Sequence, residues 1–131
     1  MNQNLDIRSH QRFENFKKAL SLYEDGIAPK MSKLEEEGLI QRFEYTFELA
    51  WKCLQDLLQE RGYVDVRGPR PVIEQAFQDG IISDGPIWLQ MLQARNETTH
   101  LYDEQIFEAI IKQVKSPFLS ALRNFRTHFP K

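Results

Sequence analysis

The amino-acid sequence predicts an all-α protein built as a helical bundle. Apolar residues recur at steps of three and four along most of the chain, which is the spacing of amphipathic helices. No segment alternates apolar and polar residues as a half-buried strand would. The 131 residues suffice for one domain with a core of its own. We therefore expect a single domain over residues 1–131, in which four long helices and one short connector helix bury one another's apolar faces.

The first half of the chain predicts two long helices. The first carries an apolar stripe of Phe13, Phe16, Leu20, Tyr23 and Ile27. Pro29 should end this helix. The second carries a stripe from Leu39 to Leu58, and Gly62 is placed to stop it just after the C-cap. Acidic residues 35–37 suit the exposed amide groups near the start of the second helix.

The remaining elements follow a connector rich in glycine and proline. Residues 72–77 are expected to form about two helical turns, begun by Pro71 and closed by Gly80. Ser83 or Asp84 can cap the next helix, which carries Ile87, Trp88, Met91, Leu92 and Arg95.

The last long helix is expected to begin after Asp103, which can cap it, and to carry apolar residues from Ile106 to Phe129. Pro117 interrupts this stripe. A proline inside a helix removes one backbone hydrogen bond and clashes with the preceding turn. We therefore expect a kink at this position, or a restart capped by Ser116.

Composition argues against several functional classes. The 17 basic and 19 acidic residues give a net charge of −2, so any RNA contact must come from a local basic patch. No apolar run approaches the roughly 18 residues of a membrane-spanning helix, and residues 1–6 lack the order of a signal peptide. Common metal and nucleotide signatures are absent. We expect a cytoplasmic protein with no metal, no cofactor and no membrane contact.

The segment from Arg95 to Tyr102 is the strongest candidate site. If the preceding helix runs on through Thr98, the following turn can bring His100 beside Arg95 and Asn96 in one cleft. A neutral imidazole can remove a hydroxyl proton, and a guanidinium can stabilise phosphoryl oxygens, without a metal. The same spacing is common by chance. An arginine, an acidic residue and a histidine near a helix end often only cap the helix and form ion pairs.

Two other sets of polar residues can each be interpreted in two ways. Arg61, Arg67 and Arg70 make the connector locally basic, so it either meets a phosphate backbone or is a solvated loop. Glu48 and Lys52 lie four residues apart on the second helix. We interpret them first as a surface ion pair, with a position facing the cleft as the alternative.

The tract R-N-E-T-T-H-L-Y at residues 95–102 resembles the R-x-x-x-x-H-x-Y motif of the HEPN superfamily. The surrounding chain, over about residues 10 to 129, resembles the nucleotidyltransferase substrate-binding protein family, the HepT-like partners of minimal nucleotidyltransferases. The stretches that carry this resemblance are Phe43–Lys52, Gly68–Arg70, Ala76–Phe77 and Trp88–Leu92. Gly68 stands where a serine is expected, which weakens the inference that its turn binds phosphate.

The resemblance implies a four-helix up-and-down bundle, usually a homodimer, that acts with a minimal nucleotidyltransferase encoded nearby. In toxin–antitoxin pairs of this kind the HEPN chain is a metal-independent endoribonuclease, silenced when the nucleotidyltransferase adds AMP to the motif tyrosine. By matching position, His100 would be the general base toward a ribose 2′-hydroxyl and Arg95 would stabilise the phosphate. Asn96 would orient the substrate, and Tyr102 would accept AMP. Arg70 of the basic connector is a further candidate for substrate binding.

Two other functions remain open. Some family members are regarded as non-catalytic subunits that bind the nucleotide or substrate of a split nucleotidyltransferase, in which case the same polar residues only bind. A purely structural dimerisation module is the third class, and it would leave the polar motif without a role.

Overall fold

Six α-helices and one 3₁₀-helix form the described part of the chain. The computed structural model describes residues 3–130, with side chains described from residue 7 onward. The elements are α1 (Gln3–Asp25), α2 (Lys33–Glu60), α3 (Pro69–Gln78), α4 (Gly85–Glu97), η1 (Thr98–His100), α5 (Glu104–Lys115) and α6 (Pro117–His128). Within these residues there is no strand, which confirms the all-α class. None of the described helices is long and apolar enough to cross a membrane.

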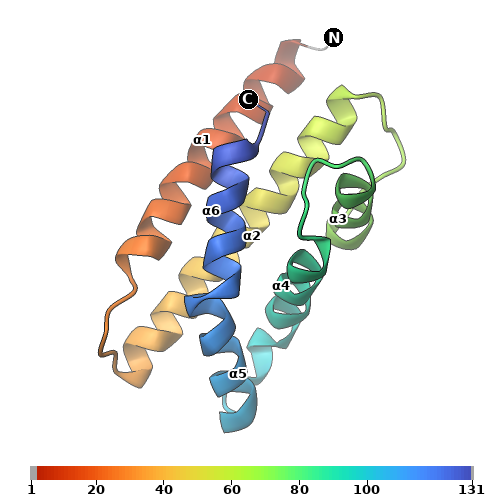
Figure 1. Ribbon diagram of the computed structural model, residues 1–131. Coiled ribbons are helices and arrows are strands. Elements are labelled where there is room, and N and C mark those ends of the chain that lie inside the picture. The colour runs from red at the N-terminus through yellow and green to blue at the C-terminus, as the bar shows by residue number, and fades with distance from the viewer. Residues whose placement is uncertain (1–2, 131) are drawn as a thin grey trace.

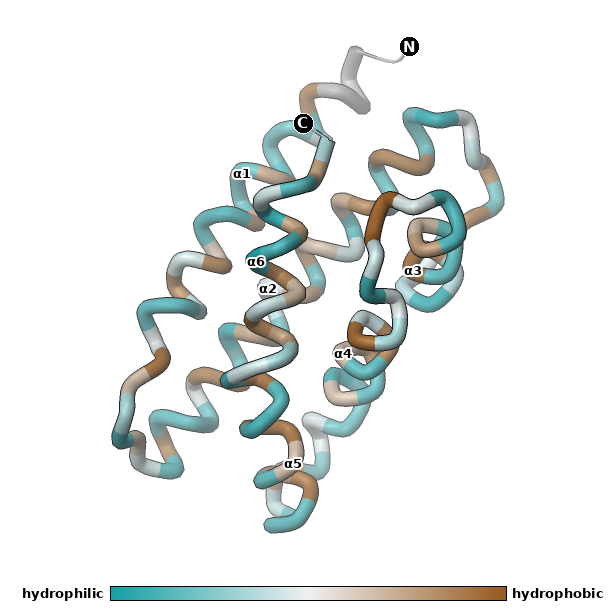
Figure 2. The backbone as a smooth tube through the Cα atoms, viewed as in Figure 1, coloured by the Kyte–Doolittle hydropathy of each residue, from teal (hydrophilic) through white to brown (hydrophobic). Residues whose placement is uncertain are grey.

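The helices pack side by side, with their long axes roughly aligned (Figure 1). α1 packs along α2, α5 packs against α2, and α6 packs against α1 and α4. The short α3 packs against α2 and α4 at one side of the molecule. Hydrophobic and hydrophilic segments alternate along each helix, as amphipathic helices require (Figure 2).

The core is dominated by aromatic side chains. Trp88 is fully buried, and its ring centroid lies 6.3 Å from that of Phe47 and 5.2 Å from that of Phe125. Phe43 stacks on Phe118 at 5.1 Å, which joins α2 to α6. These contacts involve residues from α2, α4 and α6, so one continuous core holds the helices together.

The ends of α1 and α2 follow local chemistry. α1 ends at Asp25, where the Gly26 amide donates to the carbonyl oxygens of residues 22 and 23, so the expected end at Pro29 is wrong and Ile27 lies beyond the helix. α2 begins with a capping box, in which Ser32 Oγ accepts from the Glu35 amide and the Glu35 carboxylate accepts from the Ser32 amide. This second hydrogen bond lowers the pKa of Glu35.

Glycines with positive φ terminate α2 and α3, as expected. Gly62 has φ 97°, and the following amide of Tyr63 donates to the Leu58 carbonyl at 3.1 Å, which closes the last turn of α2. Gly80 has φ 75° and plays the same role after α3. The start of α3 differs from the prediction, because Pro69 and not Pro71 is its first residue.

The caps of the last three α-helices are confirmed only in part. Asp103 caps α5 by accepting from the amides of residues 105 and 106, as predicted. Asp84 occupies the N-cap position of α4, but its carboxylate accepts from the Trp88 indole at 3.0 Å and not from the backbone. The chain restarts as α6 at Pro117, whereas the predicted cap by Ser116 is wrong, because its side chain makes no capping hydrogen bond.

Candidate functional site

The segment from Arg95 to Tyr102 spans the end of α4 and the turn that leads into α5. Arg95 and Asn96 lie in the last turn of α4, and His100 is the last residue of η1. The turn is fixed by the Asp103 amide, which donates to the His100 carbonyl at 3.0 Å. The partly buried Leu101 anchors the same turn by packing on the core. The segment therefore has a defined backbone at the α5 end of the molecule (Figure 1).

Arg95 is held by a carboxylate from a different helix. Its Nε and Nη2 atoms each lie 2.6 Å from Oε1 of Glu48 on α2, and Nη1 donates to Oδ1 of Asn96 at 3.1 Å. About a third of each side chain in the ion pair is exposed, 32% for Arg95 and 29% for Glu48. The guanidinium is therefore oriented between α2 and α4 and still reaches solvent.

Glu48 is itself held by a second donor on α2. Oε2 of Glu48 accepts from the indole Nε1 of Trp51 at 3.0 Å, so both carboxylate oxygens have a partner. The ammonium of Lys52 lies over the Trp51 ring, 5.8 Å from its centroid. The predicted Glu48–Lys52 surface pair is therefore wrong. Of the two residues, Glu48 contacts the candidate segment through Arg95, whereas Lys52 lies over Trp51. A guanidinium that offers two donors to one carboxylate is a stronger partner than a mobile lysine.

Glu44, another acidic side chain of α2, also contacts the candidate segment. The hydroxyl of Thr98 lies 2.9 Å from Oε2 of Glu44 and 2.8 Å from the Arg95 carbonyl. Glu44 and Glu48 are four residues apart and therefore face the same way. The sequence interpretation missed Glu44 and Thr98. The i, i+4 spacing of two glutamates beside an apolar stripe was the signal that could have indicated a second polar face.

The same face of α2 also positions the basic connector. The side-chain oxygen of Gln55 accepts from the Gly68 amide at 3.1 Å, directly before α3 begins. Gln55 lies seven positions after Glu48, which corresponds to about 10 Å along the helix axis. Arg70, the second residue of α3, is exposed and lies 3.9 Å from Glu74. Its guanidinium is therefore accessible to an anion at the start of α3.

His100 and Tyr102 form a separate group at the tip of the turn. Nδ1 of His100 lies 3.1 Å from the Tyr102 hydroxyl, and the two rings meet edge to face with centroids 5.8 Å apart. Both side chains are exposed, and Tyr102 is 82% exposed. Sequence interpretation placed each residue in the site but did not anticipate this contact.

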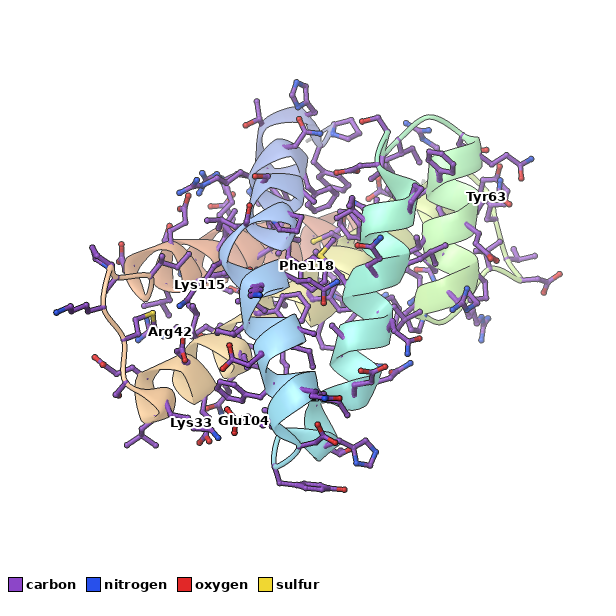
Figure 3. All side chains as sticks on the ribbon, turned by 60° about the horizontal axis from the view of Figure 1, so that its bottom comes forward. Lys33, Arg42, Tyr63, Glu104, Lys115 and Phe118 are labelled. Atoms are coloured by element: carbon purple, nitrogen blue, oxygen red, sulfur yellow. The ribbon has the colours of Figure 1, made fainter. Side chains whose placement is uncertain are left out.

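The hydrogen bonds of the candidate residues thus fall into two groups. Arg95 contacts Glu48 and Asn96, whereas His100 contacts Tyr102. The single cleft expected to hold Arg95, Asn96 and His100 together stays a prediction. Figure 3 shows polar side chains extending outward at the α5 end of the molecule, where Glu104, the first residue of α5, is labelled.

Comparison with known proteins adds two relatives. The chain is 30% identical over 81 residues to the "Probable ribonuclease HepT" of Haemophilus influenzae, a match that covers 59% of this chain and 56% of that protein. The chain thus spans just over half the length of this relative. A protein of Thermus thermophilus with a known crystal structure is similar in fold, with a TM-score of 0.80 and 29% identity over 88% of this chain and 99% of that chain.

The family comparison covers nearly all of the chain. Residues 11–131 match the model of the family described as "Nucleotidyltransferase substrate binding protein like". This range includes α2, the connector and the whole segment from Arg95 to Tyr102. The resemblance noted from the sequence is thereby confirmed, and the chain belongs to the nucleotidyltransferase substrate-binding protein family.

Proposed function

We propose that this chain is the HEPN-type subunit of a two-component nucleotidyltransferase system of the toxin–antitoxin kind, and that Arg95 and His100 make it a metal-independent endoribonuclease. The observation that carries the proposal is the end of α4, where Glu48 orients Arg95 while the next turn presents His100 and Tyr102 to solvent. The name of the Haemophilus influenzae relative and the description of the family support it.

In the proposed reaction neutral His100 takes the proton of a ribose 2′-hydroxyl. The 2′-oxygen then attacks the adjacent phosphorus, the bond to the 5′-oxygen breaks, and a 2′,3′-cyclic phosphate forms while the 5′-oxygen takes up a proton from water. Arg95 stabilises the charge that gathers on the phosphoryl oxygens. A guanidinium has five N–H donors, and the contacts with Glu48 and Asn96 use three of them, so two remain for a phosphate.

The other parts of the proposal concern binding and assembly. Asn96, beside Arg95, orients the substrate, and Arg70 binds a more distant phosphate of the RNA. Tyr102 accepts AMP from a minimal nucleotidyltransferase encoded nearby, which silences the ribonuclease. We further propose that α1, α2, α4 and the α5–α6 pair act as a four-helix up-and-down bundle, that the protein works as a homodimer, and that it does so in the cytoplasm.

The test is cleavage of a labelled single-stranded RNA by the purified protein, without its partner and with EDTA present. The proposal expects products that end in a 2′,3′-cyclic phosphate, and loss of cleavage in Arg95→Ala and in His100→Ala. His10→Ala is the matched control, because His10 is an exposed histidine on α1, away from the site. Absence of cleavage by the wild-type protein, or equal cleavage by His100→Ala, would refute the ribonuclease function.

A second candidate function is favoured by the family description itself, which refers to substrate binding. In this alternative the chain is a non-catalytic subunit that binds the nucleotide or substrate of a split nucleotidyltransferase, and Arg95 and Arg70 only bind phosphate. Calorimetric titration with ATP separates the two functions. Tight nucleotide binding that is lost in Arg95→Ala, together with intact RNA, would favour the binding subunit.

A further inference from the structure

We propose that His100 is also the proton acceptor for the modification of Tyr102, so that the chain supplies the general base for its own silencing. The inference rests on the proposed function, which makes Tyr102 the acceptor of AMP. It goes beyond that function because it assigns a chemical role to His100 in the group transfer and not only in RNA cleavage.

The geometry of the turn carries this inference. Nδ1 of His100 lies 3.1 Å from the Tyr102 hydroxyl, within direct reach for proton transfer. The Asp103 amide, which donates to the His100 carbonyl, and the packing of Leu101 on the core fix the backbone between the two rings. Because Tyr102 is 82% exposed, a nucleoside triphosphate held by another protein can approach its oxygen.

The two neutral tautomers of His100 suit two different reactions. With the proton on Nε2, Nδ1 accepts the hydroxyl hydrogen of Tyr102, and the phenol oxygen is prepared to act as a nucleophile. With the proton on Nδ1, the imidazole donates to the Tyr102 oxygen, and the lone pair of Nε2 is available to a ribose 2′-hydroxyl. The contact between His100 and Tyr102 therefore serves both RNA cleavage and the AMP transfer that silences it.

The transfer step balances with the phenol, the base and a nucleoside triphosphate that carries Mg²⁺ on its phosphates. The Tyr102 oxygen attacks the α-phosphorus of the nucleoside triphosphate, the bond from that phosphorus to the bridging oxygen of the β-phosphate breaks, and pyrophosphate leaves. The phenol proton moves to Nδ1 of His100 as the new bond forms, and the resulting imidazolium later releases it to water. No oxidant, reductant or further reactant is required.

Two other tyrosines of the chain, Tyr23 and Tyr63, are placed differently. Tyr23 is buried and donates to the Val114 carbonyl, and burial raises its pKa. The Tyr63 hydroxyl donates to the carboxylate of Asp79, and this hydrogen bond raises the pKa of Tyr63, which opposes formation of a nucleophilic phenolate. Tyr102 combines high exposure with an imidazole nitrogen at its hydroxyl.

Modification of Tyr102 would silence the site through the same contact. After transfer, the oxygen of Tyr102 is an ester oxygen that has no hydrogen to donate. A phosphodiester anion then lies beside the imidazole, and a nearby negative charge favours the protonated form. An imidazolium cannot take the proton of a 2′-hydroxyl. Silencing therefore requires no rearrangement of the helices.

The experiment measures incorporation of AMP at Tyr102 by mass spectrometry, with the full chain, the neighbouring nucleotidyltransferase, ATP and Mg²⁺. We expect His100→Ala to lower kcat about 100-fold, with little change in KM for the protein substrate, because the base and not the docking surface is removed. Added imidazole should restore part of the rate. His100→Gln, which keeps a polar side chain but no base, should be as slow as His100→Ala, and His10→Gln should match the wild type.

The outcomes separate this inference from the function on which it rests. A wild-type chain that carries no AMP on Tyr102 overturns the proposed modification and the inference together. Modification of wild type and His100→Ala at the same rate overturns only the role of His100. A slow His100→Ala that imidazole does not accelerate, or a fast His100→Gln, equally shows that His100 is not the proton acceptor.

Discussion

The carboxylate of Glu48 fixes the guanidinium of Arg95 across the contact between α2 and α4. Oε1 of Glu48 accepts from Nε and Nη2 of Arg95 at 2.6 Å, and Oε2 accepts from the indole Nε1 of Trp51 at 3.0 Å. The orientation of Arg95 is thus fixed by a residue that lies 47 positions earlier in the sequence. This relationship makes Glu48 a positioning residue whose removal has separate effects on stability and on activity.

For stability, we expect Glu48→Ala to lower the free energy of unfolding by about 1 kcal/mol. The ion pair is partly exposed, so screening by solvent limits its contribution, and the larger share of the loss comes from the unpaired indole of Trp51. Urea unfolding at neutral pH measures the change. Glu14→Ala is the control, because its ion pair with Lys17 is exposed at the surface, and it should lower the free energy of unfolding less than Glu48→Ala does. Equal effects of the two substitutions would contradict this account.

For activity, Arg95→Lys should lower the rate of RNA cleavage about 100-fold, if the proposed function holds. A lysine keeps the charge but cannot donate to Glu48 and Asn96 and also contact a phosphate from fixed positions. Initial rates on a labelled RNA give the measurement. Arg67→Lys, in the exposed connector, is the control and should stay within about twofold of wild type. If Arg95→Lys also stays within twofold, Arg95 acts only through its charge.

The helices were predictable because their signals are local. Steps of three and four in the apolar residues, glycines at positions of positive φ such as Gly62 and Gly80, and an aspartate before α5 all act within one or two turns of the chain. The S-x-x-E pattern of Ser32 and Glu35 was equally visible, and it would have given the start of α2. The start of α3 at Pro69 was not predictable, because either Pro69 or Pro71 can be the first residue of a helix. The turn at Gly68 determines which of them is.

The site was predictable only in part, because its contacts join distant segments. The motif identified Arg95, His100 and Tyr102, but spacing alone assigned Glu48 to Lys52, its neighbour one turn away. The partner observed, Arg95, comes close only because α4 and the rest of the bundle pack together. The edge-to-face contact of His100 and Tyr102 depends on the conformation of η1 and the following turn, for which the sequence has no periodic signal.

The contact between α3 and α4 depends on the absence of a side chain at Gly85. A Cβ atom at this position would lie 2.5 Å from Cγ of the Phe77 ring, so the ring would have to move. Gly85→Ala should therefore destabilise the fold by about 1–3 kcal/mol, as overpacking does. A double-mutant cycle by urea unfolding tests the cause. Adding Phe77→Ala should remove most of the cost of Gly85→Ala, whereas simple additivity of the two substitutions would show that the clash is not the reason.

The end of α1 is joined to α6 by Glu24, whose carboxylate accepts from Arg126 at 2.8 and 3.1 Å and from Arg123 at 2.6 Å. The hydrogen bonds from Arg126, and then those from Arg123, hold the pKa of Glu24 below its ordinary value of 4.5. Because the folded pKa is lower than the unfolded one, the stabilisation is present above about pH 4.5 and is lost as the pH falls through the folded pKa.

Wild type should therefore lose more stability than Glu24→Gln between pH 6 and about pH 3, since the amide cannot titrate and contributes nothing to the acid dependence. Urea unfolding of both proteins across this range measures the difference in slope. Glu37→Gln is the matched control, because Glu37 is an exposed glutamate at the start of α2, and it should keep the wild-type dependence. If Glu24→Gln instead follows the wild-type curve at every pH, protonation of Glu24 does not contribute to the loss of the fold in acid. Core packing, such as that of Phe13 and Phe16 against Phe125, then maintains the link between α1 and α6.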